Sequence, residues 1–269
     1  MNKPATSTPP IIIRKMGFLF DDMPRHWFGG DPVRTHIVNG LHFVFPAGER
    51  FFIRSVKQYR DRVSDELRER IVGFSGQEAQ HQAEHRRAFR AIEEQGYDVR
   101  SFLDWYEHLA YDVIEKSTRP IWRLAATAAL EHYTAALGEL VLSSDILDDC
   151  DPAMRDLLLW HACEEIEHKS VAFDVLQAVD PRYRIRALGF GIGTVTLFYF
   201  WGRGTLHMLC AEDVRWITAL TGPVVLTVPV GGLDRRAFLR SLASLDLAES
   251  VIGRFRRRHA QSGRSETPA

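Results

Sequence analysis

Two Glu-x-x-His steps, each preceded by a further glutamate, carry the clearest chemistry in this sequence. The residues are Glu49, Glu78 and His81 in one half, and Glu131, Glu165 and His168 in the other. Helical positions three residues apart lie about 60° from each other, so each glutamate and histidine can aim at one point. Carboxylates and imidazoles bind divalent cations, and the repeated pattern therefore predicts a pair of metal ions.

The turns between these residues bring them to matching heights. The two glutamates of the first half are equidistant from the junction before Ser64, a residue that can cap a new helix. Glu131 and Glu165 are equidistant from Asp148, and Pro152 then starts the next helix. The helical stretch from each turn to its glutamate spans about 22 Å, so the four carboxylates are expected in the middle of a helical bundle.

Helical phase selects the remaining ligand. His161, Glu165 and His168 lie on one stripe of a helix. Glu164 shares a face with His168, but only Glu165 repeats the three-residue step, so Glu164 is expected to support a ligand from outside the site. His85 lies one helical turn beyond His81. It is expected either to support a metal ligand from outside the site or to lie on the surface. The predicted metal ligands are Glu49, Glu78, His81, Glu131, His161, Glu165 and His168.

Charge is the physical reason to expect metal. Four ionised carboxylates in an apolar bundle are very costly unless positive charge accompanies them. Two divalent ions supply that charge almost fully. Oxygen and imidazole ligands without sulfur suit iron or manganese better than zinc. The predicted cofactor is therefore two iron ions, with an iron and manganese pair as the alternative.

Length and composition indicate one globular domain with added segments. The chain has 269 residues, 45% hydrophobic content and a net charge of -1, which offers no general attraction for nucleic acid. Three cysteines without paired spacing fit a reducing cytoplasm. The predicted division is a flexible N-terminal segment over residues 1–30, a metal-binding bundle over 31–180, an apolar helical extension of the same domain over 181–250, and a basic disordered tail over 251–269.

Helical periodicity predicts an all-α fold, a ferritin-like four-helix bundle with a long crossover and extra helical segments at both ends. A short helix is expected over residues 31–43. Pro46 either starts or kinks the segment that carries Glu49, because proline removes a backbone donor and disturbs the preceding turn.

The second bundle helix is expected from about residue 65 to residue 95, where Gly96 stops it. Residues 97–119 contain a helical pattern of their own, with Ser101 as the cap, and form the predicted crossover. Pro120 opens the third bundle helix.

Two apolar runs, residues 187–201 and 217–233, are too short to span a membrane. They predict a buried helix and an irregular segment that pack over the bundle or at a homodimer interface. The alternative is association with a membrane surface, supported by Arg184, Arg186 and Arg203. That alternative would place a cytoplasmic protein at the periphery of the inner membrane.

Three segments of residues 40–180 resemble the bacterial family named "predicted metal-dependent hydrolase". They are Pro46-Ala47-Gly48-Glu49-Arg50-Phe51-Phe52, Glu78-Ala79-Gln80-His81, and His161-Ala162-Cys163-Glu164-Glu165-Ile166-Glu167-His168-Lys169 through Phe173-Asp174. The resemblance implies hydrolysis at a metal site. The seven-ligand set is also similar to that of di-iron arylamine N-oxygenases, which implies oxidation by dioxygen.

The ligand set favours a dinuclear oxidoreductase that activates dioxygen on a small organic substrate, by N-oxygenation or hydroxylation. The first alternative is hydrolysis by a water that two metal ions activate, and the second is a ferroxidase or iron-binding protein. No catalytic residue is predicted apart from the metal ligands. Thr134 and Gly138, small residues near Glu131, either leave room for a substrate or allow close helix packing.

Overall fold

A computed structural model describes residues 10–212 of the chain. Every secondary-structure element in this range is a helix. The elements are α1 (Pro32–Lys57), η1 (Arg60–Arg62), α2 (Asp65–Glu94), α3 (Val99–Glu107), η2 (His108–Glu115), α4 (Pro120–Ser143), α5 (Pro152–His168), α6 (Val171–Val179) and α7 (Tyr183–Cys210). Within this range no strand is present, only an isolated bridge between Phe28 and Cys150. The predicted all-α helical bundle is confirmed.

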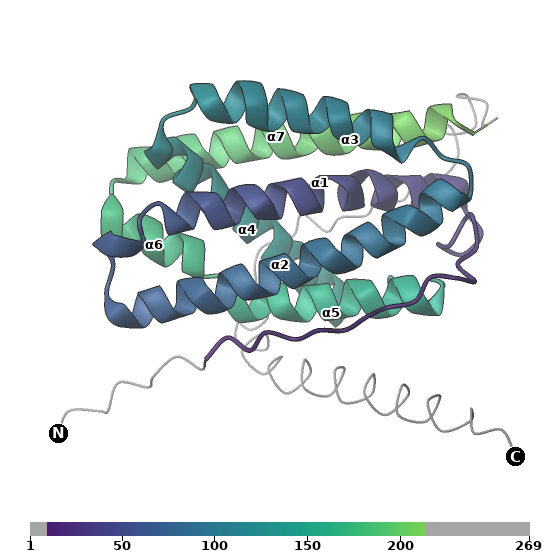
Figure 1. Cartoon of the computed structure of the whole chain (residues 1–269), viewed down its shortest axis with the longest axis horizontal. Coiled ribbons are helices and arrows are strands. Elements are labelled where there is room, and N and C mark those ends of the chain that lie inside the picture. The colour runs from purple at the N-terminus through teal and green to yellow at the C-terminus, as the bar shows by residue number, and fades with distance from the viewer. Residues whose placement is uncertain (1–9, 213–269) are drawn as a thin grey trace, which may run out of the picture.

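Four long helices surround the centre of the molecule. Helix α1 packs against α2, and α4 packs against α5. The short helices α3 and η2 connect these two hairpins, as the predicted crossover requires. Helix α7 then lies across α1 and α4, on the side away from α2 and α5 (Figure 1). The two hairpins therefore face each other across the centre of the bundle, and α7 covers one side of it.

Helix starts follow the predicted capping chemistry with one exception. The Asp31 carboxylate accepts hydrogen bonds from the backbone of Val33 and Arg34, so α1 begins at Pro32. Helix α2 ends before Gly96, whose φ of 93° favours glycine. The predicted Ser101 cap is wrong. Asp98 caps α3 instead by accepting from the Ser101 N–H at 3.0 Å, and the helix therefore starts earlier.

Pro46 does not divide α1, which continues from Pro32 to Lys57 as one helix. The expectation that a helix over residues 31–43 ends before a second one is therefore wrong. An interior proline costs a helix about 3 kcal/mol, but tertiary packing can outweigh local propensity. Phe43 and Ala47, on either side of Pro46, are both buried in the core, and this packing holds the helix together.

The N-terminal segment over residues 10–30 is packed, in contrast to the flexible segment expected over residues 1–30. It runs in an extended path along α2 and α5 (Figure 1). Phe18 and Trp27 are buried in the core, and the Trp27 indole N–H donates to the Asn39 side chain at 3.0 Å. The Arg14 side chain is also buried, and it pairs with α5. The aromatic residues of this segment anchor it.

Glycines allow α7 to approach the bundle closely. A Cβ added at Gly40 on α1 would lie 2.4 Å from the Thr205 backbone nitrogen on α7. A Cβ at Gly189 would lie 2.4 Å from the Ala125 Cβ on α4. Both distances are shorter than any normal contact, so larger residues at these positions would force α7 outward.

Replacing Gly40 with alanine should therefore destabilise the protein by about 1–3 kcal/mol, the usual cost of overpacking. The matched control is Gly202→Ala on α7, where an added Cβ meets no atom within 4 Å. That control should be neutral or stabilising by up to about 1 kcal/mol, because alanine favours helix. Urea unfolding midpoints measure both changes. Equal midpoints for the two variants would contradict the close contact between α1 and α7.

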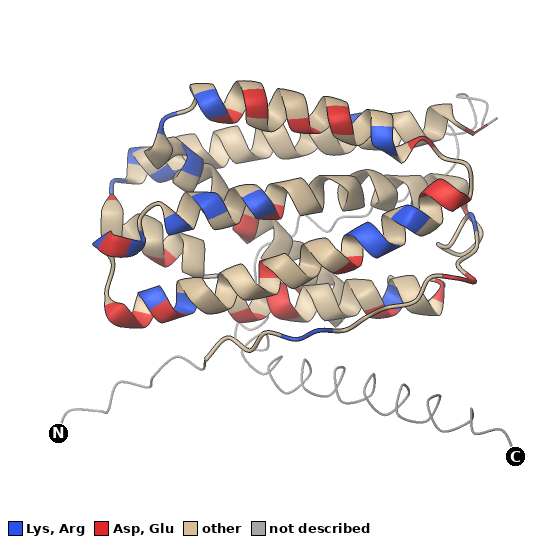
Figure 2. Ribbon diagram, in the orientation of Figure 1, with Lys and Arg blue, Asp and Glu red and all other residues tan. Residues whose placement is uncertain are grey.

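The outer face of α7 is apolar and exposed. Figure 2 shows a helix almost without charge, since residues 187–202 contain no Asp, Glu, Lys or Arg. Val195 is 70% exposed and Phe198 53% exposed. Over residues 10–212, no helix has the length and apolar character needed to cross a bilayer. The apolar run 217–233 and the basic tail 251–269 lie outside the described residues, and the homodimer and membrane association stay predictions.

Candidate metal centre

All seven residues predicted as ligands meet in the middle of the bundle. Helix α1 contributes one of them, α2 two, α4 one and α5 three. Their exposed fractions are 2% for Glu49, 0% for Glu78 and His81, 1% for Glu131, 4% for His161 and Glu165, and 0% for His168. The turn positions and the helical repeat place these residues at one level and on inward faces, and in the structure their side chains converge there.

One group of side chains forms around His81 and His161. The His161 Nε2 lies 2.7 Å from Glu165 Oε1 and 3.9 Å from Glu49 Oε1. The His81 Nδ1 lies 3.6 Å from the same Glu165 Oε1 and 3.7 Å from Glu78 Oε2. Two imidazole nitrogens and three carboxylates therefore face one small volume, with a geometry that can hold an ion.

A second group forms around His168. Its Nε2 lies 3.2 Å from Glu78 Oε1, 3.5 Å from Glu131 Oε2 and 3.4 Å from Glu165 Oε2. Glu78 and Glu165 thus each present one oxygen to His81 and the other to His168. Two carboxylates shared between two groups are an arrangement that suits a pair of metal ions.

Many polar atoms at this centre lack a hydrogen-bond partner among the described residues. Both carboxylate oxygens of Glu49, Glu78 and Glu131 are buried without one, as are the His81 Nδ1 and the His168 Nε2. The atoms lie close together, yet most do not point along hydrogen-bond directions toward each other. Buried polar groups in proteins are nearly always satisfied. The donor atoms therefore fit a divalent ion at their common focus.

The surroundings of the carboxylates divide them into two kinds. Burial raises the pKa of Glu49 and Glu131 well above the ordinary value, and the negative charge of Glu78 adds to the effect. Burial also acts to raise the pKa of Glu165 and Glu78, but the adjacent histidines outweigh it and lower both pKa values. Without metal, these surroundings therefore favour the ionised form of Glu78 and Glu165 and the protonated form of Glu49 and Glu131.

The histidines are affected in the opposite sense. Burial acts to lower the pKa of His81 and His168, but neighbouring carboxylates raise both well above the ordinary value. For His81 the main partners are Glu164 and Glu78, and for His168 the main partner is Glu165. The surroundings therefore favour the protonated form of both imidazoles, and a metal ion competes with protons for them.

Each of the three central histidines has an outer partner that fixes its ring. The His81 Nε2 lies 3.1 Å from Glu164, the His168 Nδ1 lies 2.9 Å from the side-chain Oε1 of Gln77, and the His161 Nδ1 lies 2.8 Å from the His85 Nε2. Such outer hydrogen bonds orient metal-binding histidines and make them more basic. Glu164 and His85 occupy the supporting positions that helical phase allowed.

Arg14 connects two of these partners. Its guanidinium donates to Glu164 at 3.0 Å and to Glu167 at 2.6 and 2.8 Å. Glu167 in turn accepts from the Gln77 side-chain amide at 2.8 Å. One arginine of the N-terminal segment therefore supports the outer partners of both His81 and His168.

Sequence reasoning missed Gln77, Arg14 and His42. Gln77 has no motif of its own, and Arg14 lies in a segment expected to be flexible. The His42 ring lies 4.2 Å from the His85 ring, and burial lowers the His42 pKa to about 3, so this imidazole is neutral. In the sequence, only the position of Gln77 directly before the predicted ligand Glu78 indicates that this residue could contact the site.

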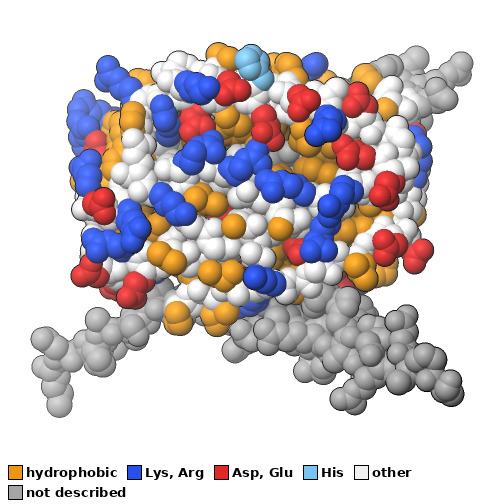
Figure 3. Space-filling model, viewed as in Figure 1, with side chains coloured by type: hydrophobic (Ala, Val, Ile, Leu, Met, Phe, Trp, Pro, Cys, Tyr) orange, Lys and Arg blue, Asp and Glu red, His pale blue; other side chains and the backbone are white. Residues whose placement is uncertain are grey.

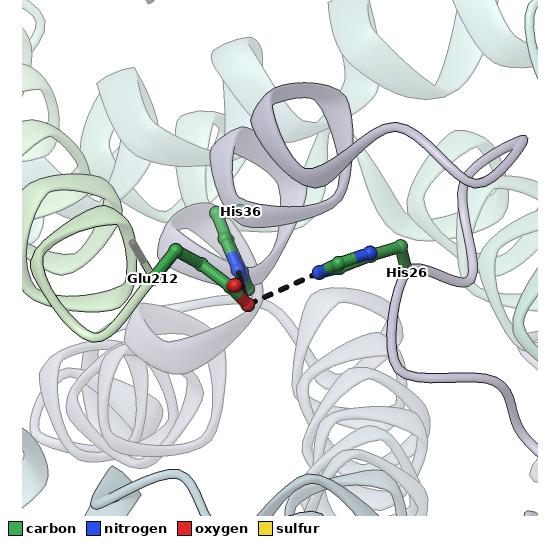
Figure 4. Close-up of side chains that lie close together, drawn as sticks. All are labelled: His26, His36 and Glu212. Carbon is green, nitrogen blue, oxygen red and sulfur yellow. Dashed lines mark hydrogen bonds and ion pairs between the residues drawn. The ribbon is translucent and has the colours of Figure 1, made fainter. Parts of the chain in front are cut away.

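A second group of possible ligands lies near the end of α7, outside the bundle centre. The Nε2 atoms of His26 and His36 each lie 3.1 Å from Glu212 Oε1 (Figure 4). Burial acts to raise the Glu212 pKa, but hydrogen bonds from Tyr97 and the two histidines lower it to about 2. Arg25 also pairs with this carboxylate at 3.3 Å. The charge of Glu212 is therefore already balanced by an arginine.

Comparison with known proteins agrees with this geometry. The family model described as "Predicted metal-dependent hydrolase" matches residues 12–242, which is most of the chain. Searches of curated proteins and of solved structures found no match. The match includes all seven central residues and Arg14, Gln77 and Glu164 around them. The chain therefore belongs to the family of predicted metal-dependent hydrolases.

Proposed function

We propose that the protein is a dinuclear metal enzyme. Glu49, His81 and His161 would hold one ion, Glu131 and His168 would hold the other, and two carboxylates would bridge them. The bridging residues are Glu78 and Glu165. The observation that carries the proposal is the set of buried oxygens and nitrogens without hydrogen-bond partners at this focus. Two divalent ions would balance the four carboxylates and use these atoms.

The reaction class that the family supports is hydrolysis. Two bound ions would lower the pKa of a shared water and stabilise the charge on a leaving oxygen. The chain contributes the geometry: each histidine ring is fixed by an outer partner, and Phe45 covers one side of the centre, with its ring 4.9 Å from the His161 ring. Apolar cover of this kind limits solvent at the centre and strengthens electrostatic interactions there.

Activation of dioxygen by two iron ions is the second candidate. The ligand set favours it, because four carboxylates and three imidazoles without sulfur suit iron and can stabilise its oxidised state. The asymmetry of the histidines adds to this, since the group around Glu49 has two and the group around Glu131 has one. Ions in different environments are well suited to redox chemistry at one of them.

Metal analysis combined with oxygen uptake separates these candidates. Protein produced without added metal should contain about two ions per chain if the site is dinuclear. Two zinc ions, with release of product from ester or amide substrates and no oxygen consumption, would support hydrolysis. Two iron ions that consume oxygen after anaerobic reduction would support oxidation instead. Repeated oxidation of many added iron ions per chain would indicate a ferroxidase. One ion or none would contradict the dinuclear site.

Replacing Glu164 with glutamine should weaken metal binding by about 10- to 100-fold without changing the number of ions, because His81 loses its charged partner. Competition with a chromophoric chelator measures the affinity. The matched control is Glu69→Gln on the exposed side of α2. An unchanged affinity for Glu164→Gln would mean that His81 does not need this carboxylate to bind metal.

Metal affinity should rise steeply with pH. The pKa values of His81, His168, Glu49 and Glu131 are all raised, so protons compete with metal for each of these groups. Acid therefore opposes binding, and alkaline solution favours it. Affinity measured at pH 6 and pH 8, with proton release followed in weak buffer, tests this. Equal affinities without proton release would contradict binding at these four residues.

A further inference from the structure

An apolar cavity lies beneath α7, beside the metal centre. Its walls come from α1, η2, α4 and α7, and it encloses about 110 Å³. Apolar cavities of similar size in proteins, such as one of about 150 Å³, hold a ring the size of benzene. The close contacts at Gly40 and Gly189 hold α7 over this space. The cavity is therefore large enough for a small organic molecule.

The inner end of the cavity adjoins the predicted metal ligands. Phe45, Gly48 and Phe52 line it, and these residues flank Glu49 on α1. Leu130 and Thr134 line it from α4, where they flank Glu131. The Phe45 ring is half-buried, and it also contacts the rings of His161 at 4.9 Å and His85 at 5.2 Å. One aromatic ring thus separates the cavity from the metal centre.

The wall of the cavity offers little hydrogen bonding to a ligand. Aliphatic and aromatic side chains dominate it, including Ile192, Leu197 and Phe200 of α7. The hydroxyls of Tyr106 and Tyr111 lie 2.5 Å apart and bond to each other. Burial raises the pKa of both tyrosines above the ordinary value, so both are neutral. The body of a ligand in this space must therefore be apolar.

The outer end of the cavity opens among charged residues. A second, polar hollow adjoins it and shares Tyr111, Glu115 and Arg123 with it. Four basic residues, two from α1, one just after η2 and one from α4, line this mouth together with three acidic residues. The residues that line the mouth therefore carry a net charge of one positive unit. On the face seen in Figure 3, Lys and Arg side chains gather over α1 and α2.

Three of the four basic residues at the mouth form ion pairs with acidic residues. Arg50 pairs with Glu107 at 2.7 Å, Arg54 with Glu115 at 2.5 Å, and Lys116 with Asp112 at 2.7 Å. The fourth cation is Arg123. Among the described residues it has no acidic partner, and its Nε donates only to the Thr118 carbonyl oxygen at 2.8 Å. Its remaining guanidinium donors are available at the point where the cavity opens.

We propose that this cavity is the substrate site and that it takes an amphipathic monoanion, an apolar chain or ring with one carboxylate. The apolar body fills the cavity, and the carboxylate pairs with Arg123 at the mouth. The bond that reacts then lies toward Phe45, at the opposite end from the carboxylate. This inference rests on the proposed function, because the metal centre beyond Phe45 makes the cavity a substrate site.

Binding of straight-chain carboxylates to metal-loaded protein tests the proposal without turnover. Hexanoate, heptanoate and octanoate should bind with affinity rising about fourfold per methylene until the cavity is full. Octanol should bind more weakly than octanoate. Arg123→Gln should weaken octanoate by about 10- to 100-fold and leave octanol unchanged, because only the charged hydrogen bonds are lost. Isothermal titration calorimetry measures each affinity.

Two further variants make the result specific. Ala126→Leu fills part of the cavity wall and should weaken octanoate and octanol alike. Arg100→Gln, an exposed arginine on α3, should change neither. The proposal is overturned if octanol equals octanoate, if Arg123→Gln leaves octanoate unaffected, or if Ala126→Leu does so. Metal content is measured on the same samples. If the protein holds two ions but does not bind the ligands, only this inference is overturned. If the protein holds no ions but still binds octanoate, only the proposed dinuclear enzyme is overturned.

Discussion

Replacing Glu78 with glutamine should abolish binding of both metal ions at once. Its two oxygens face different histidines, with Oε2 3.7 Å from His81 and Oε1 3.2 Å from His168. A neutral amide removes the negative charge from both positions. Loss of an outer partner costs a metal site about 10- to 100-fold in affinity, and loss of a shared ligand should cost each ion more. Metal analysis after dialysis, together with calorimetric titration, measures the result.

Terminal ligands provide the comparison. Glu131→Gln should weaken only the ion near His168, and Glu49→Gln only the ion near His161, while Glu69→Gln on the outside of α2 should change neither. Each glutamine keeps the size and shape of the glutamate that it replaces, so the metal-free proteins should remain helical by circular dichroism. If Glu78→Gln retained one ion at full affinity, the carboxylate would belong to a single site rather than to both.

Metal loading should raise the melting temperature by about 10–20 °C. An ion present at 100 times its dissociation constant stabilises the folded state by about 2.7 kcal/mol, and two independent ions give about 5 kcal/mol. In a protein of this size, each kcal/mol shifts the melting temperature by about 2–4 °C. Calorimetric scans with and without a chelator measure the shift.

The Glu78→Gln variant is the control for this stabilisation, because it should melt at one temperature whether or not metal is added. Arg14 offers a second comparison. Arg14→Ala should lower the melting temperature with and without metal, since it removes contacts to Glu164 and Glu167 that do not depend on an ion. If the native protein binds two ions and its melting temperature is unchanged, then the ions bind outside the buried centre.

The convergence of seven side chains could be predicted because it depends on local rules. Turn residues set the lengths of the hairpin arms, and the helical repeat sets which side chains share a face. That repeat distinguished Glu165, which faces the centre, from Glu164, which contacts His81 from outside. The helix that carries Glu49 was less predictable, because Pro46 argued for a break that packing prevents.

The outer contacts could not be predicted because they join segments far apart in the chain. Gln77 reaches His168 across 91 positions, and nothing in the local sequence marks either residue as a partner of the other. Arg14 lies beside a segment rich in proline, serine and threonine, where composition argued for disorder. The cavity beneath α7 depends on glycines whose role becomes visible only once the facing helix is known.

The path of the N-terminal segment along α2 and α5 has a consequence for the order of events during synthesis. Arg14 and Glu164 are 150 positions apart. At a translation rate of about 5–20 residues per second, Arg14 is made about 8–30 s before its partner. Until then the ring of His81 lacks the support that this arginine gives to Glu164, and the ligands that α5 contributes have not been made. We therefore expect nascent chains arrested before α5 to bind metal weakly, and the complete centre to form only after the last bundle helix has been translated.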